Sequence, residues 1–320
     1  MIQLINDTIQ EALTKVKDAI IKEKKARNYE LEEPDYTVAL AIVLPQLLNK
    51  ALAFSNVKLG GCFIHQSPRV TFNIPRVGET SCELGDLLVL LRKRTVDDIR
   101  YNAALLQLKK SDSNPVTLTN DGDLKQLHLY ENWPEFIIKS INEKYDVFPK
   151  VVTQGALYCI IKRNPEFTLY MAEPMSTMEY SGEMTFGRFI RDAINWQTGR
   201  SISDETNKDN DEWSRLIWNL IQNVQNKVIH KGVFNRTNVG YKGHSKLSDD
   251  FLEFMLNSNE NVDSTISDYV NHSRDDKMKK YFSNDSGAPT NEDRDIDDNE
   301  GVGISILFID IDDRKEREER

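Results

Sequence analysis

Long apolar runs, cysteine pairs and glycine-rich loops are what this chain of 320 residues lacks, and each absence narrows the class of protein. No apolar run approaches the roughly 20 residues that cross a bilayer, so we expect no membrane partner. The three cysteines, Cys62, Cys82 and Cys159, have no CxxC spacing, which argues against a disulfide framework and a zinc site. Residues 1–20 carry acids and no uninterrupted apolar stretch, unlike a secretory signal. We therefore expect a protein of the reducing cytoplasm.

Positive charge is also in short supply, because 41 Lys and Arg face 51 Asp and Glu, for a net charge of −10. The charge is unevenly spread. Ten acids and one arginine lie between Asp285 and Asp313, whereas nine basic and five acidic residues lie between Val57 and Lys110. Attraction of a polyanion depends on the local field, so the net charge does not exclude a nucleic-acid partner. A plain solvated surface is the alternative interpretation of the basic region.

The spacing of apolar residues predicts an α/β fold. Helical spacing covers residues 2–27, and a second helix from about 36 to 54 is apolar all round, so we expect it to be buried and kinked at Pro45. Short apolar runs separated by Gly and Pro between residues 61 and 173 indicate a sheet. From Thr185 the pattern is helical again, and residues 302–310 form a buried strand that can join the sheet.

These patterns divide the chain into five segments. We expect an N-terminal helix at 1–30, a sheet-containing core at 31–180, a helical C-terminal region at 181–275, an acidic mobile linker at 276–300, and a terminal strand with a charged tail at 301–320. The acidic segment is interpreted as a plain linker, because charge runs are usually solvated. The alternative is that it folds over the basic region as a mimic of nucleic acid.

Two very apolar runs, LLVLL and AALLQLKK, carry polar residues at one end. Asp86 precedes the first run, and Gln107 and Lys109 close the second. If the runs pair as a hairpin with Leu91 opposite Ala104 and RKRTVDDIRYN as the loop, Asp86 lies opposite Lys109. Gln107 and Lys109 are two residues apart and share a face of the sheet. Such groups are costly to bury unless they pair or bind an ion, so the pattern predicts a functional site.

The order of Asp86, a strand and then Gln107-Leu108-Lys109 resembles the PD-(D/E)xK nuclease superfamily, in its variant with Gln in the third motif. That variant occurs among restriction-like and defence-associated nucleases. The resemblance covers about residues 30–175 and is most specific over 83–110. It implies a restriction-endonuclease-like mixed sheet flanked by helices, here with added N- and C-terminal helical segments. Gly85 stands where the family name has a proline.

Roles for the three motif residues follow from the resemblance. It implies that Asp86 and the carbonyl oxygen of Gln107 hold Mg²⁺ or Mn²⁺, and that Lys109 orients or activates the attacking water. Mg²⁺ takes hard oxygen ligands and keeps several waters, which suits one or two carboxylates with a carbonyl. The lysine can act as a positioned cation or lose its proton more easily beside the metal.

Further acids are candidates to complete the metal site. In the family a glutamate on the first core helix often does so, and Glu33 is the best match, with Glu32 as its rival. Glu83 is a second acid near the same strand end. Because Gln107 brings no charge, we expect Glu33 or Glu83 to compensate.

Basic residues near these strands are candidates for contacts with a nucleic-acid backbone. They are Arg69, Arg92, Lys93, Arg94, Lys110 and His65. The alternatives are a solvated loop for Arg92–Arg94 and a hydrogen-bonded strand-end histidine for His65. In QLHLYENW, Gln126 is placed near the rim of the site, and Tyr130 and Trp133 are interpreted as core residues.

The sequence thus predicts an endonuclease that hydrolyses phosphodiester bonds with Mg²⁺, with DNA favoured over RNA. The resemblance alone implies its setting, as an effector of bacterial anti-phage or restriction-type defence with a possible protein partner. One alternative is a catalytically silent subunit of the same fold that binds nucleic acid or a partner protein. Another is a purely structural partner in a larger complex.

Overall fold

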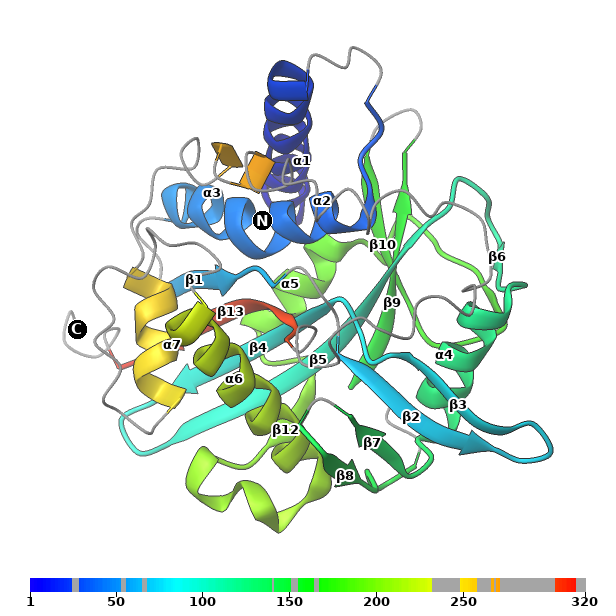
Figure 1. Ribbon diagram of the computed structural model, residues 1–320. Helices are drawn as coiled ribbons and strands as arrows, with labels where there is room; N and C mark the ends of the chain where they lie inside the picture. The colour runs from blue at the N-terminus through cyan, green and yellow to red at the C-terminus, as the bar shows by residue number, and fades with distance from the viewer. Residues whose placement is uncertain are drawn as a thin grey trace.

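The computed structural model describes residues 1–24, 29–52, 56–64, 68–139, 141–150, 155–163, 167–231, 248–257, 266, 267, 269, 270 and 303–314. They form a mixed α/β structure in which helices cover both faces of a central sheet (Figure 1). The predicted α/β class, with a mixed sheet flanked by helices, is confirmed. No helix within the described ranges is long and apolar enough to cross a membrane.

The central sheet has seven strands. Along its path they are β1 (Val57–Cys62), β13 (Ser305–Asp312), β4 (Leu87–Arg94), β5 (Ile99–Lys110), β9 (Ala156–Lys162) and β10 (Thr168–Ala172). The seventh strand, β12 (Arg200–Ile202), pairs with the start of β5. The pairs β13–β4 and β5–β9 are parallel and the others antiparallel, so the sheet is mixed.

The two faces of the sheet are covered by different elements. One face packs against α1 (Ile2–Lys24), α2 (Glu33–Val38), the π-helical turn η1 (Ala39–Val43), α3 (Leu44–Ala51) and α5 (Phe186–Ile194). The other packs against α4 (Asp121–Asn132), α6 (Glu212–Lys231) and α7 (Ser248–Asn257). Leu87 and Val89 enter the first core and Leu88 enters the second, which explains why β4 is apolar at every position from Leu87 to Leu91.

A second, four-stranded sheet lies on the α4 side. Its strands are β3 (Gly78–Glu83), β2 (Arg69–Ile74), β7 (Phe136–Ile138) and β8 (Glu143–Tyr145), in that order. Outside the two sheets, β6 (Val116–Thr117) pairs with β11 (Thr177–Met178), and η2 (Glu205–Asn210) is a 3₁₀-helix before α6. The four-stranded sheet matters because β3 leads directly into Asp86.

The strand that the sequence placed at 302–310 is observed at Ser305–Asp312, and it lies inside the central sheet, next to the edge strand β1. β13 is inserted between β1 and β4, and all of its eight residues are buried. The segment predicted as an acidic mobile linker, 276–300, lies outside the described residues. The helical C-terminal region predicted at 181–275 also contributes a strand, β12, to the sheet.

The second predicted helix has a more complex path than a simple kink. It begins at Glu33 and passes through the π-helical turn η1 before Pro45 near the start of α3. Pro45 has no N–H to donate to the carbonyl of Ala41, four residues earlier. That carbonyl lies directly against Gly61 of β1, where a Cβ would overlap its oxygen. The close approach therefore requires glycine at this point of β1.

Candidate active site

The two apolar runs form the predicted antiparallel hairpin, β4–β5, but in a different register. Leu91 pairs with Asn102 rather than with Ala104, because the turn is shorter than expected and β4 continues to Arg94. Asp86 therefore lies opposite Gln107, and its N–H donates to the carbonyl of Leu106 at 2.9 Å. The predicted pairing of Asp86 with Lys109 is wrong by two residues. A shift of two residues keeps each side chain on its face of the sheet.

The turn between β3 and β4 fixes the carboxylate of Asp86. One carboxylate oxygen accepts from the N–H of Leu108 at 2.7 Å, which holds the side chain against β5. The hydroxyl of Tyr130 on α4 donates to the carbonyl of Leu84 at 2.7 Å. A Cβ at Gly85 would lie 3.0 Å from that hydroxyl oxygen. Tight packing against Tyr130 thus accounts for glycine at the position where the family name has a proline.

Gln107 is buried, and its side-chain carbonyl is held by a second glutamine. Gln126 on α4 donates its Nε2 to the Oε1 of Gln107 and also to the carbonyl of Glu83, at 3.2 Å in the second case. A carbonyl oxygen has two lone pairs, so Gln107 keeps one acceptor position after this contact. Gln126 therefore lies inside the site, where the sequence had placed it only at the rim.

Lys109 forms an ion pair with Asp123, a residue that the sequence analysis missed. Asp123 lies in the first turn of α4, where its N–H donates to Oδ1 of Asn120 at 2.8 Å. Its other carboxylate oxygen accepts from Nδ2 of Asn120 at 2.5 Å. The side chains of Lys109 and Asp123 are only 24% and 16% exposed. A run of Asn, Asp and Gly before an amphipathic helix is a capping signal, but it does not indicate the contact with Lys109.

Two glutamates approach this end of the sheet from other elements. Burial raises the pKa of Glu33, at the start of α2, and the charge of Glu83 raises it further, while Lys109 and Lys110 act in the opposite direction. Burial also raises the pKa of Glu83, and Arg69 opposes that shift. The charges of Glu83 and Lys109 both act on the pKa of Glu33, so these groups lie within electrostatic range of one another. Glu32, the alternative to Glu33, is exposed, whereas Glu33 is partly buried, so burial favours Glu33 as the acid of the site.

The other candidates for nucleic-acid contact have different surroundings. Arg69 begins β2 in register with Glu83 and donates from Nη2 to Oγ of Ser81 at 3.2 Å. Lys110 is exposed at the end of β5. His65 lies outside the described residues. Arg69 and Lys110 thus remain accessible at the side of the candidate site.

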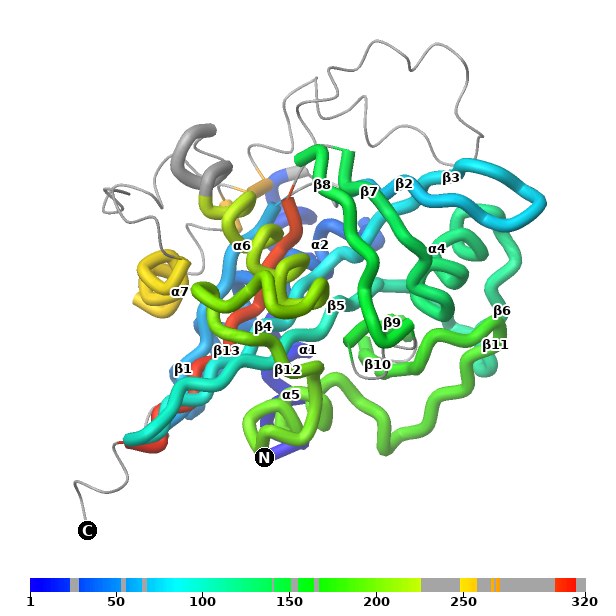
Figure 2. Tube along the Cα trace, turned by 90° about the horizontal axis from the view of Figure 1, so that it is seen from below, coloured from blue at the N-terminus to red at the C-terminus, as the bar shows by residue number. Residues whose placement is uncertain are grey.

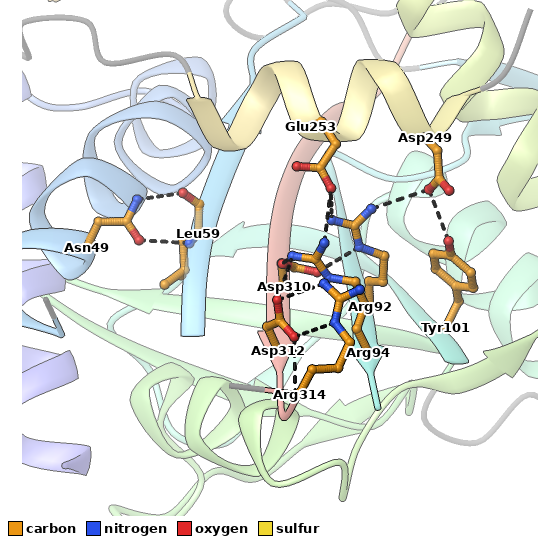
Figure 3. Close-up of polar contacts among 10 residues, drawn as sticks. All are labelled: Asn49, Leu59, Arg92, Arg94, Tyr101, Asp249, Glu253, Asp310, Asp312 and Arg314. Atoms are coloured by element: carbon orange, nitrogen blue, oxygen red, sulfur yellow. Dashed lines mark hydrogen bonds and ion pairs between the residues drawn. The ribbon is translucent and has the colours of Figure 1, made fainter. Parts of the chain in front are cut away.

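Arg92, Lys93 and Arg94 do not form the solvated hairpin tip that was expected. They are the last residues of β4, and their charges are paired with acids. Arg92 and Arg94 contact acids of β13 and α7 (Figure 3). Lys93 pairs with Asp313, the residue after β13. Arg92 is 3% exposed and donates from Nε to Oδ1 of Asp310 at 2.6 Å. The prediction of a solvated loop failed because acids far along the chain pair with this basic triplet, so that Arg92 is buried and Lys93 and Arg94 are partly buried in a strand.

The candidate site therefore combines Asp86, Gln107 and Lys109 with Glu33 and Glu83. Among the residues that the structure describes, no three His, Cys, Asp or Glu side chains already form a group that could hold a metal ion. No protein-family model, curated protein or solved structure matches the chain. The function must be inferred from the site itself.

Proposed function

We propose that this protein is a metal-dependent nuclease of restriction-endonuclease-like fold that hydrolyses phosphodiester bonds of DNA. One observation carries the proposal: the β4–β5 register, continued by one residue beyond the pair Leu87–Leu106, sets Asp86 opposite Gln107, with Lys109 on the same face of β5. The resemblance to nucleases with Gln in the third motif extends the proposal to an effector of bacterial anti-phage or restriction-type defence, in the cytoplasm, with a protein partner in a defence complex.

The donor set suits Mg²⁺ or Mn²⁺. Asp86 and the free lone pair of Gln107 would supply two hard oxygen ligands, and Glu33 or Glu83 a third, leaving positions for water and phosphate. Glu33 and Glu83 are carboxylates whose pKa is raised by burial, and such groups gain stability from a nearby cation. When bound, the ion supplies Lewis-acid stabilisation of the negative charge that develops on the phosphoryl oxygens.

The remaining residues of the site act by position and charge. Lys109 orients the attacking water and places an ammonium beside the scissile phosphate. Asp123 limits where that ammonium can move, because it lies on α4 and is itself held by Asn120. Gln126 fixes the amide of Gln107, so that the carbonyl oxygen keeps one orientation. Two contacts from α4 thus hold two residues of β5 in place.

The test is cleavage of duplex DNA by the full chain with Mg²⁺, with Mn²⁺ or with a chelator. Wild type should cut only with a divalent ion, and Lys109→Ala should abolish cutting while the protein stays folded by circular dichroism. Lys58→Ala is the matched control, because Lys58 is exposed on β1 and should not matter. Cleavage by Lys109→Ala at the wild-type rate would contradict the proposal. So would a well-folded wild type that cuts no nucleic acid with either metal.

The silent subunit is the second candidate, and two contacts favour it. Lys109 is neutralised by Asp123, and Gln107 brings no charge to the ligand set. A silent subunit predicts that Lys109→Ala keeps full biological activity, such as protection of cells against phage. A nuclease effector predicts that the same variant loses that activity together with cleavage.

A further inference from the structure

The hairpin formed by β2 and β3 projects from the body of the molecule beside α4 (Figures 1 and 2). Its base adjoins the candidate site, because Arg69 pairs in register with Glu83, whose carbonyl accepts from Gln126. Each strand has six residues. At about 3.3 Å per residue, the tip lies about 20 Å from this base.

The tip of the hairpin has an unusual residue in a strained position. Pro75 is followed by Arg76, whose φ is 71°, and the N–H of Val77 donates to the carbonyl of Ile74 at 3.1 Å. This is the arrangement of a type II turn, in which the third position favours Gly or Asn because its φ is positive. An arginine there strains the backbone, which points to a function of its side chain.

The side chains at the tip present a cation next to apolar surface. Arg76 is exposed, and among the residues that the structure describes it has no hydrogen-bond or ion-pair partner. Val77 is 70% exposed. Proteins that bind the minor groove of DNA place arginine in its negative potential and set apolar side chains, proline among them, against base steps. An unpaired guanidinium favours such a polyanion over an apolar protein surface.

We propose that the β2–β3 hairpin is a DNA-binding arm that inserts Arg76 and Val77 into the minor groove of a duplex. The inference rests on the proposed function, since the duplex is the substrate whose phosphodiester bond lies at the candidate site. At about 3.4 Å per base pair, the arm contacts the groove about six base pairs from that bond. The narrow minor groove of A·T tracts has a stronger negative potential, so the arm favours A·T-rich DNA at this distance.

The test measures binding without cutting. Fluorescence anisotropy of the full chain, with a chelator present, compares two duplexes of equal length, one with an A·T tract and one rich in G·C. Arg76→Asn removes the charge with a residue that tolerates positive φ, and Val77→Ser removes the apolar surface. Arg100→Asn is the matched control, because Arg100 is an exposed arginine at the far end of β5.

We expect wild type to prefer the A·T duplex and Arg76→Asn to bind it about tenfold more weakly, with the preference lost. Val77→Ser should weaken binding about threefold, and Arg100→Asn should have no effect. In Arg76→Asn, the slope of the logarithm of the binding constant against the logarithm of the salt concentration should become smaller by about one, as expected for the loss of one charge contact. Three results would contradict a DNA-binding role of the arm: an unchanged affinity in Arg76→Asn, an equal loss of affinity in Arg100→Asn, or a preference of wild type for single-stranded RNA.

The arm and the nuclease can fail separately in these measurements. If Arg76→Asn loses the A·T preference but wild type cuts no DNA, the DNA-binding role of the arm is supported and the proposed reaction is contradicted. If wild type cuts DNA with Mg²⁺ and Arg76→Asn binds DNA as wild type does, the proposed reaction is supported and the DNA-binding role of the arm is contradicted.

Discussion

Lys109 and Asp123 form an ion pair between the end of β5 and the first turn of α4. Both side chains are largely buried, so the contact limits the positions that the lysine ammonium can occupy. Asp123 accepts from Asn120 with its other oxygen, which ties the pair to the start of the helix. In a nuclease, this arrangement makes Asp123 the residue that positions Lys109.

We predict that Asp123→Asn lowers the rate of DNA cleavage about tenfold at saturating Mg²⁺ without changing DNA affinity. An amide of the same size removes the ion pair and leaves Lys109 free to move away from its aligned position. The measurement is the single-turnover cleavage rate, with anisotropy for binding. Asp121→Asn is the control, since Asp121 is an exposed acid on the same helix turn. A cleavage rate equal to wild type in Asp123→Asn would show that Lys109 needs no such partner.

A second prediction concerns the uncharged ligand. Gln107→Glu should lower the Mg²⁺ concentration at half-maximal cleavage several-fold, because a carboxylate replaces a neutral carbonyl at the same position. The contact with Gln126 should survive, since Gln126 is the donor in that hydrogen bond. Gln107→Met, which has no oxygen, should raise the metal requirement instead. If all three proteins need the same Mg²⁺ concentration, Gln107 is not a metal ligand.

The pKa shifts of Glu33 and Glu83 predict how stability depends on pH. Burial raises both pKa values, so the folded protein binds more protons than the unfolded chain between the unfolded and folded values. These groups therefore contribute their full stabilisation at a pH below the unfolded pKa, which is about 4.3. That contribution to the free energy of unfolding is lost as the pH rises through the folded pKa. At neutral pH without metal, the burial of these two carboxyl groups therefore lowers the free energy of unfolding.

Accordingly, Glu33→Gln and Glu83→Gln should each raise the melting temperature at neutral pH without metal by roughly 2–4 °C. The gain should vanish near pH 4, where the wild-type carboxyls hold their protons. Mg²⁺ should stabilise wild type more than either variant, because ligands must be deprotonated to bind it. Glu32→Gln is the control, since Glu32 is exposed beside Glu33. A melting temperature that falls in both variants would place these carboxylates in stabilising contacts instead.

The shared face of Asp86, Gln107 and Lys109 could be predicted from the sequence because side chains in a strand alternate with a period of two. The register could not. Arg92, Lys93 and Arg94 look like a solvated loop when only local residues are considered, so the predicted hairpin ended too early. The partner that buries Arg92 is Asp310, which lies 218 positions further along the chain.

The contacts from α4 also lay beyond sequence reasoning. Gln126 and Tyr130 are one turn apart on α4, and the sequence indicated only that Gln126 lies near the rim of the site and that Tyr130 is a core residue. The contact of Gln126 with Gln107 and that of Tyr130 with Leu84 depend on how α4 packs against the sheet, which a helical pattern does not fix. Asp123 gave only a capping signal, and its role toward Lys109 follows from the packing.

The last prediction separates a structural from a DNA-binding role for Arg92. Arg92 and Asp310 are 3% and 1% exposed, and Arg92 also donates to Glu253 at 2.5 Å (Figure 3). Asp310→Asn removes one charge and leaves the guanidinium buried without its main partner. Breaking a buried ion pair in this way costs about 3–5 kcal/mol of unfolding free energy. Urea denaturation followed by tryptophan fluorescence measures that loss.

The matched control is Asp313→Asn, which removes the partner of Lys93. That pair is more exposed, at 22% and 31%, and should contribute only about 0–1 kcal/mol. Arg92→Ala should lower stability as Asp310→Asn does and leave the DNA affinity of the folded protein unchanged. A stable Arg92→Ala variant that has lost DNA binding would contradict this prediction. It would mean that β13 and α7 move aside to expose Arg92. Arg92 would then be the nucleic-acid contact that the sequence had indicated.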